Sequence, residues 1–284
     1  MKLWIVFVII YGILKGAREP MKKEALKNSA VLPVLFGHTF IGFLMTAPSA
    51  KGITDIPPYV FFWVVVKSLS IFVGWIFAFK GIKKIPVSVY GIADMSRVIF
   101  STLLGIVFLN ESLTFRGAIS LFLVAAGLYF ANQKKDIENG EYQYKYIIYV
   151  FLSCFFNAIS GTLDKYIMST GEITSSALQF WFMLLISVFY LSYMVIKKEK
   201  LELKKVFTNP WVYLLSFSLV FGDRLLFIAN QDPAAKVTIM TVLKQSSAVI
   251  TILLGKLLYK EKNIARKLVC ALVIICGIVL SVIR

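Results

Sequence analysis

The sequence is poor in the residues that carry most enzyme chemistry. It has a single histidine, His38, and its three cysteines lie apart in apolar runs without CxxC spacing. A Ser-His-Asp triad or a metal centre would need more of these side chains, and the Walker A, HExxH and GxSxG motifs are missing too. We therefore expect no cofactor, no metal, no direct use of ATP and no enzymatic activity.

Charged residues are scarce as well. They make up 16% of the chain, whereas hydrophobic residues make up 58% and the mean hydropathy is +0.78. Average soluble proteins carry about a quarter charged residues. A soluble fold of this length could not cover its surface with so few polar groups, so a soluble enzyme, a disordered chain and a disulfide scaffold are all excluded.

Long apolar runs fill the chain instead. A helix needs about 20 mostly apolar residues to cross the hydrocarbon core of a bilayer. Ten segments fit, and they run over 3–18, 31–50, 58–80, 86–109, 113–131, 146–168, 173–196, 210–230, 236–259 and 266–283. A signal peptide over residues 1–17 is the alternative for the first, although no clear A-x-A site follows it. The expected fold is an all-α polytopic membrane protein.

The net charge of +16 follows from the connections between these segments. The odd-numbered connections hold twenty Lys and Arg residues, from Lys15 to Lys267, and the even side with both termini holds five. Cytoplasmic connections carry such an excess. We therefore expect both termini outside the cell and a multi-pass protein in a cytoplasmic membrane, as in bacteria. No nucleic acid is needed to explain the charge.

The two halves of the chain are related by an internal repeat. Residues 86–130 match the sequence 150 positions later without a gap, and Glu111 faces Glu261. Five segments separate equivalent positions, so the halves must be inverted relative to each other. We expect a first five-helix repeat over 1–133, a cytoplasmic connector over 134–145, and a second five-helix repeat over 146–284. Inverted repeats are typical of secondary transporters, with the substrate site where the halves meet.

Three motifs carry a specific resemblance. LLGIVFLNE (103–111), LLGKLLYKE (253–261) and the stretch Leu163-Asp164-Lys165-Tyr166 are similar to the EamA family of the drug/metabolite transporter superfamily. The resemblance covers essentially the whole chain. It implies ten helices in two halves of five, a central cavity lined by both halves, and alternating access.

Polar side chains recur on one face of the fourth segment and on the equivalent face of the ninth. They are Tyr90, Asp94, Arg97, Ser101 and Gly105, and then Met240, Lys244, Ser247, Thr251 and Gly255. Their helical spacing predicts two polar stripes that face a shared interior. Asp94 and Lys244 occupy equivalent positions and form either a substrate or gating pair across the halves, or Asp94 forms a structural pair with Arg97.

Other ionisable groups stand at membrane depth, where they are costly without a partner or a wet pathway. Lys67, with Trp63 on its side of the helix, lines the pathway or sits in a buried ion pair. Asp223 and Arg224 point about 100° apart, so at most one faces a given partner squarely.

Two further positions are less central. Asp164 and Lys165 stand near the end of their segment, so they either line the pathway or anchor the helix at the interface. His38 is expected to be a structural histidine, with a proton relay as the alternative.

These residues predict a transporter for a small polar metabolite. Basic groups outnumber acidic ones inside the segments, which favours an anionic or zwitterionic substrate. We expect a secondary active exporter, driven by the substrate gradient, an exchanged solute or protons. The alternatives are an intramembrane enzyme that acts on a lipid-linked substrate and a regulatory membrane protein without transport. A channel is less consistent with the mixed charge.

Overall fold

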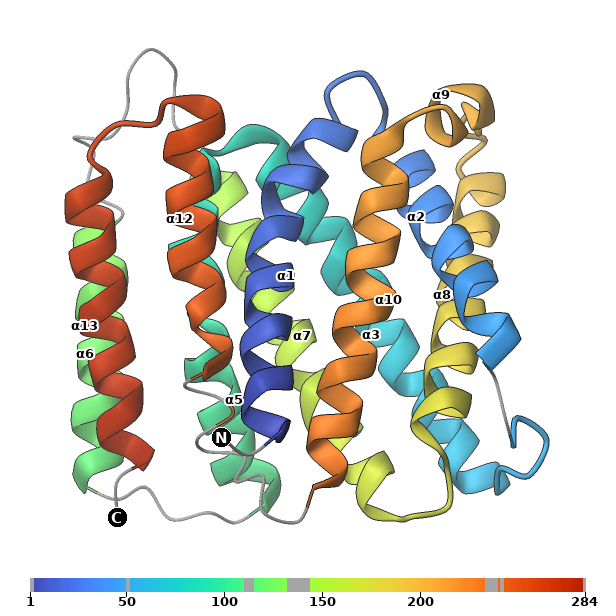
Figure 1. Ribbon diagram of the computed structural model, residues 1–284, viewed down its shortest axis with the longest axis horizontal. Coiled ribbons are helices and arrows are strands. Elements are labelled where there is room, and N and C mark those ends of the chain that lie inside the picture. Colours follow the sequence, from blue (N-terminus) through green and yellow to red (C-terminus); the bar gives the residue numbers. More distant parts are fainter. Residues whose placement is uncertain are drawn as a thin grey trace.

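The computed structural model describes residues 3–49, 52–109, 115–131, 144–232, 240 and 243–282. Over these ranges the chain forms helices and no strand, and the helices run side by side in one bundle (Figure 1). The first half contains α1 (Leu3–Ala25), α2 (Val31–Thr46), η1 (Ala47–Ser49), α3 (Pro58–Lys84), α4 (Val87–Asp94), α5 (Arg97–Leu109) and α6 (Phe115–Ala131). The second half contains α7 (Tyr144–Ser169), α8 (Ser175–Ile196), α9 (Leu203–Phe207), α10 (Pro210–Gln231), α12 (Ser246–Tyr259) and α13 (Ile264–Val282).

Several helices are suited to a bilayer. Among the described residues, α3, α7, α8, α10 and the stretch Val87–Leu104 are long and apolar enough to cross a membrane. Shorter apolar helices cover Val31–Thr46, Gly117–Phe130 and Ser246–Tyr259. By length and composition these helices indicate a multi-pass membrane protein, and within the described ranges five of them meet both criteria.

Helix α1 is longer than the expected segment 3–18, because it continues through Pro20 to Ala25. A proline inside a helix cannot donate a hydrogen bond to the carbonyl four residues before it. Here the hydroxyl of Thr251 on α12 donates to that carbonyl, which belongs to Gly16, at 3.1 Å. Lys15 and Arg18, which the charge count placed in the first connection, consequently lie within a helix.

The fourth expected segment is broken, contrary to the single helix predicted over 86–109. At Met95 and Ser96 the backbone N–H groups donate to carbonyls three residues earlier, on Ile92 and Ala93, so α4 ends in a tight turn before α5 begins. In the second half, a turn at Gln245 precedes α12. This position is the repeat equivalent of Met95. Both halves thus interrupt the same helix at the same place.

The helix contacts have the symmetry of the repeat. The contacts map onto one another when each helix is exchanged for its counterpart in the other half. The exchanges are α1 with α7, α2 with α8, α3 with α10, α4 and α5 with α12, and α6 with α13. The α1–α10 contact becomes α7–α3, α1–α12 becomes α7–α5, and α2–α10 becomes α8–α3. The pairs α2–α8 and α6–α13 join a helix to its own counterpart, and α4 contacts α12, the counterpart of α5. These contacts interlock the two halves instead of leaving each to pack on itself.

Glycines permit two of these close approaches. A Cβ atom on Gly16 would lie 2.6 Å from the carbonyl oxygen of Ser247, where α1 crosses α12. At the α6–α13 contact, a Cβ atom on Gly277 would lie 3.1 Å from the carbonyl oxygen of Ser120, and one on its repeat mate Gly127 would lie 2.5 Å from a side-chain carbon of Ile274. Backbones this close leave no space for a larger residue.

The lysine-rich connections that the structure describes meet at one end of the bundle. Lys83 at the end of α3 donates to the carbonyl of Ser29 at 2.8 Å, and Asn209 donates to the carbonyl of Ala25 at 3.2 Å. Helix α9 and the end of α12 lie at this end, whereas α1 begins and α13 ends at the opposite one (Figure 1). This grouping agrees with the charge bias in the sequence.

Candidate functional site

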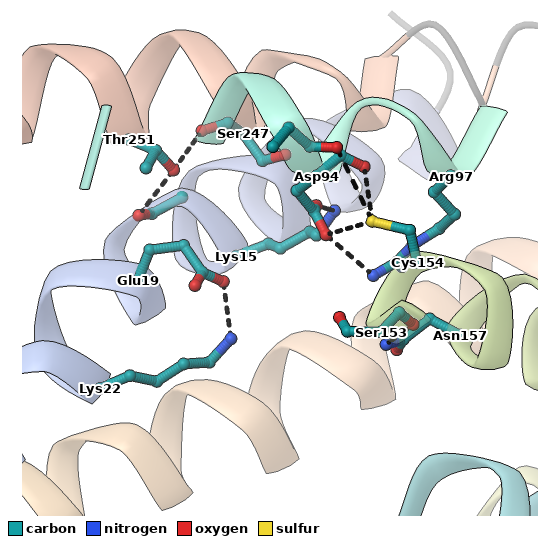
Figure 2. A network of polar contacts seen from close by, with 12 residues as sticks. Lys15, Glu19, Lys22, Asp94, Arg97, Ser153, Cys154, Asn157, Ser247 and Thr251 are labelled. Carbon is teal, nitrogen blue, oxygen red and sulfur yellow. Dashed lines mark hydrogen bonds and ion pairs between the residues drawn. The ribbon is translucent and has the colours of Figure 1, made fainter. Parts of the chain in front are cut away.

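Helix α1 brings basic side chains to the turn between α4 and α5. The ammonium group of Lys15 lies 2.7 Å from one carboxylate oxygen of Asp94, and the guanidinium of Arg97 lies 3.3 Å from the other. Figure 2 shows both groups converging on Asp94, with the thiol of Cys154 on α7 beside it. Asp94 is therefore shared between two cations from different helices.

A second ion pair joins the halves through α3 and α7. The Nζ atom of Lys67 lies 3.1 Å from a carboxylate oxygen of Asp164, and it lies 3.8 Å from the centre of the Phe182 ring. Only 3% of the Lys67 side chain is exposed. Asp164 thus supplies the partner that Lys67 lacks in its own helix. The side chain of Lys165 lies outside the described residues.

A third pair joins α1 to α10. The guanidinium of Arg18 lies 3.5 Å from Asp223 and 5.5 Å from the centre of the Tyr11 ring. Arg224, the next residue, points elsewhere and donates a hydrogen bond to Ser176 on α8. The two neighbours do face different partners, as their helical positions require.

Lys244 differs from these groups. Among the described residues it makes no hydrogen bond and no ion pair. The charges that act on it are those of Lys15, Arg97, Asp164 and Asp223. The expected Asp94–Lys244 pair is therefore not formed, and Asp94 instead makes the expected pair with Arg97 and an unexpected one with Lys15.

Together these groups form what we call the central charge cluster. It comprises Lys15, Arg18, Lys67, Asp94, Arg97, Asp164, Asp223 and Lys244. Five are basic and three are acidic, so the cluster carries an excess of two positive charges. A charged side chain at the centre of a bilayer costs roughly 2.5–3.5 kcal/mol on insertion scales. An uncompensated excess at this depth therefore calls for a ligand, for water or for both.

The polar stripes are only partly as predicted. The turn at Met95 interrupts the first stripe, so Tyr90 is buried in the core whereas Ser101 is exposed. On α12, Ser247 is buried against α1, as expected of a face that avoids lipid. Trp63, one turn before Lys67 on α3, is half-buried and packs edge-on against Tyr166 on α7.

His38 lies in a closed setting, as expected of a structural residue. It is 2% exposed, its ring nitrogen lies 3.2 Å from the hydroxyl of Ser216, and that hydroxyl donates to the carbonyl of His38 at 2.9 Å. Trp75 stacks on the imidazole. Among the described residues, no group of three or more His, Cys, Asp or Glu side chains gathers to hold a metal ion.

At the lysine-rich end, Glu261 closes over the start of α4. Its carboxylate accepts hydrogen bonds from the backbone N–H groups of Val87 at 2.7 Å and Ser88 at 3.0 Å, and from the Ser88 hydroxyl. Lys267 donates to that hydroxyl at 2.9 Å. We call these four residues the Glu261 latch. A carboxylate suits the positive end of a helix dipole, so the latch ties the second half to the first. Its repeat mate, Glu111, lies outside the described residues.

Sequence reasoning missed Lys15 and Arg18 because it counted them with the first connection, although the expected segment 3–18 includes both. Tyr11, Lys15, Arg18 and Lys22 recur at steps of four, three and four, which is the spacing of one helical face. This periodicity could have placed them inside the bundle. Lys22 indeed continues that face and lies 2.7 Å from Glu19, as Figure 2 shows.

Comparisons with known proteins agree with this architecture. The model of the EamA-like transporter family matches residues 2–133 and residues 144–283. A solved structure titled only "Crystal structure of protein" is similar to this chain with a TM-score of 0.63 and 9% identity, over 98% of this chain and 96% of that one. At this identity the likeness concerns the fold alone. No curated protein matches the chain.

Proposed function

The chain belongs to the EamA-like transporter family, and from this premise we propose that it is a secondary transporter. It moves a small polar metabolite across the membrane by alternating access, in the direction of export. The observation that carries this proposal is the central charge cluster, which α1, α3, α4, α5, α7 and α10 build across both halves, with Lys244 just before α12. Costly charges at the interface of two repeats are what a substrate site requires.

The membrane arrangement is part of the proposal. Ten helical spans form two inverted repeats, over 1–133 and 146–284, and both termini lie outside a bacterial cytoplasmic membrane. The repeat symmetry of the helix contacts supports the inverted halves. The lysine-rich connections at one end support the orientation, because basic connections stay in the cytoplasm.

Alternating access needs ends that open and close in turn. The Glu261 latch is made in this structure and would hold the cytoplasmic end shut. The broken helices α4–α5 and α12 can bend at their turns while the rest of each half moves as a unit. Opening would release Val87 and Ser88 from Glu261 and bring the cluster into contact with the cytoplasm.

Transport is driven by the substrate gradient, by an exchanged solute or by protons. Protons would bind to Asp94, Asp164 or Asp223. These carboxylates face basic groups from other helices, so protonating one would break an ion pair between the halves. Such a step couples protonation to rearrangement. An intramembrane enzyme remains the alternative, and product formation would reveal it.

Transport by purified protein in proteoliposomes tests the proposal. A panel of labelled amino acids, nucleobases, organic anions and quaternary amines is screened for saturable uptake, and exchange against internal substrate is measured for each hit. We expect Lys67→Ala and Arg97→Ala to abolish uptake while the protein still inserts. Lys256→Ala, on the exposed end of α12, serves as the control. Unchanged uptake in both variants, or no saturable uptake across the panel, would contradict the proposal.

A further inference from the structure

The positive charge in the central charge cluster is concentrated at one place. Lys15 and Arg97 each hold one oxygen of the same carboxylate, Asp94. Lys244 is near enough to both for mutual repulsion, and α12 begins against α1 beside them. Two cations therefore share one carboxylate, and Lys244 adds a third positive charge on the segment that packs against α1 at Gly12. The remaining acids do not correct this imbalance, because they already pair with other bases.

Those other acids are Asp164 and Asp223. Asp164 lies 3.1 Å from Lys67, and Asp223 lies 3.5 Å from Arg18. Both act on Lys244 from a distance, but neither makes an ion pair with it. A matched acid for Lys244 is absent from the described part of the chain.

Unused hydrogen-bond donors lie at the same place. Within the described ranges the Nε atom of Arg97 is buried without a partner, and so is the hydroxyl of Ser153, which is 1% exposed. Figure 2 shows Ser153 on α7 close to the Asp94–Arg97 pair. Neither cation is sealed inside the bundle, because 29% of the Arg97 side chain and 14% of the Lys15 side chain are exposed.

We propose that Lys15, Arg97 and Lys244 form an anion site that takes the carboxylate or phosphate group of the transported substrate. Arg97 presents a planar set of donors that matches either group, and the two ammonium ions supply point charges from opposite helices. The positive groups repel one another while the site is empty. The negative charge of a bound substrate anion offsets this repulsion. This inference rests on the proposed function and names the class of its substrate, an organic anion.

The test measures anion binding as a thermal shift of the detergent-solubilised full chain. Sodium acetate, succinate and phosphate are titrated at constant ionic strength set with sodium chloride, and succinamide provides the neutral counterpart of succinate. We expect a saturable rise in Tm with at least one anion and none with succinamide. Comparing succinate with phosphate identifies the preferred group.

Variants then locate the site. Removing an unpaired buried cation should relieve repulsion, so Lys244→Met should raise the Tm of the anion-free protein while it weakens anion binding at least tenfold. Arg97→Gln should weaken binding as strongly. Lys256→Met removes the same charge from the exposed end of α12, which follows Lys244 in the chain, and it should leave anion binding unchanged.

The outcomes separate this inference from the transport proposal. No saturable shift with any of the three anions, an unaltered shift in Lys244→Met, or a lower Tm of that variant without anion would overturn the anion site. If the anion shift depends on Lys244 and Arg97 but proteoliposomes carry nothing, the site stands and the transport proposal fails. If transport is saturable but no anion changes the Tm, the transport proposal stands and the anion site fails.

Discussion

The contribution of the Glu261 latch to the free energy of unfolding can be worked out directly from its geometry. Glu261→Ala removes a carboxylate that accepts from two backbone N–H groups and one hydroxyl at the start of α4. It also removes the carboxylate that lies 4.0 Å from the buried ammonium of Lys267. We expect this substitution to be among the most destabilising in the protein.

The magnitude can be worked from these contacts. Hydrogen bonds to a charged group contribute about 1.5–3 kcal/mol each in water-soluble proteins. Hydrogen bonds between membrane helices average only about 0.6 kcal/mol, because the unfolded state in the membrane also finds partners. The latch lies at the end of the helices and has three accepted bonds, so a loss of about 3 kcal/mol is expected. Glu261→Gln keeps one acceptor oxygen and should lose about half as much.

Reversible unfolding in mixed micelles measures this difference. Glu172→Ala is the matched control, because Glu172 is an exposed glutamate bonded to Tyr59 outside the bundle core. Exposed substitutions of this kind change stability by about 0.5 kcal/mol or less. If Glu261→Ala is as mild as Glu172→Ala, the latch does not hold the halves together and the reasoning is wrong.

Three further predictions concern packing, pairing and orientation. Gly16→Ala should lower the free energy of unfolding by about 1–3 kcal/mol, because its Cβ would meet the Ser247 carbonyl. Gly161→Ala, with open space around it, should raise the free energy of unfolding by about 0.5–1 kcal/mol. The same unfolding experiment in micelles compares the two variants, and equal effects would contradict the close crossing. A double-mutant cycle of Lys67→Met with Asp164→Leu should yield a coupling energy of about 0.5–3 kcal/mol, and additivity would refute the pair. A cysteine at Asn28, in an exposed connection, should react with an impermeant reagent only from the cytoplasmic side of intact cells, and labelling from outside would reverse the orientation.

Periodicity and composition predicted the helical elements well. Each of the ten apolar segments corresponds to a helix or to a broken helix, because burying apolar faces in lipid or protein leaves the backbone no other way to satisfy its hydrogen bonds. The repeat also predicted which helices are equivalent. The breaks were not predicted, since Met95 and Gln245 are ordinary helix residues and the turn depends on packing between the halves.

The candidate site was predicted in kind but not in pairing. Lys67, Asp94, Arg97, Asp164 and Asp223 all lie in the central charge cluster, because charge at membrane depth is conspicuous in a sequence. Apart from the expected i,i+3 pair of Asp94 with Arg97, the partners come from distant helices, and no local pattern encodes those contacts. Lys15 and Arg18 stayed hidden because a proline and a run of charges resemble the end of a segment.

Side-specific labelling of Lys244→Cys tests the central claim most directly. The variant is made with the three native cysteines replaced, reconstituted in oriented proteoliposomes, and treated with an impermeant thiol reagent from the inside or the outside. Alternating access predicts that the cysteine reacts from each side separately and that a bound anion slows both reactions. A cysteine that reacts from neither side, or from one side only under all conditions, would contradict a substrate site shared in turn by the two compartments.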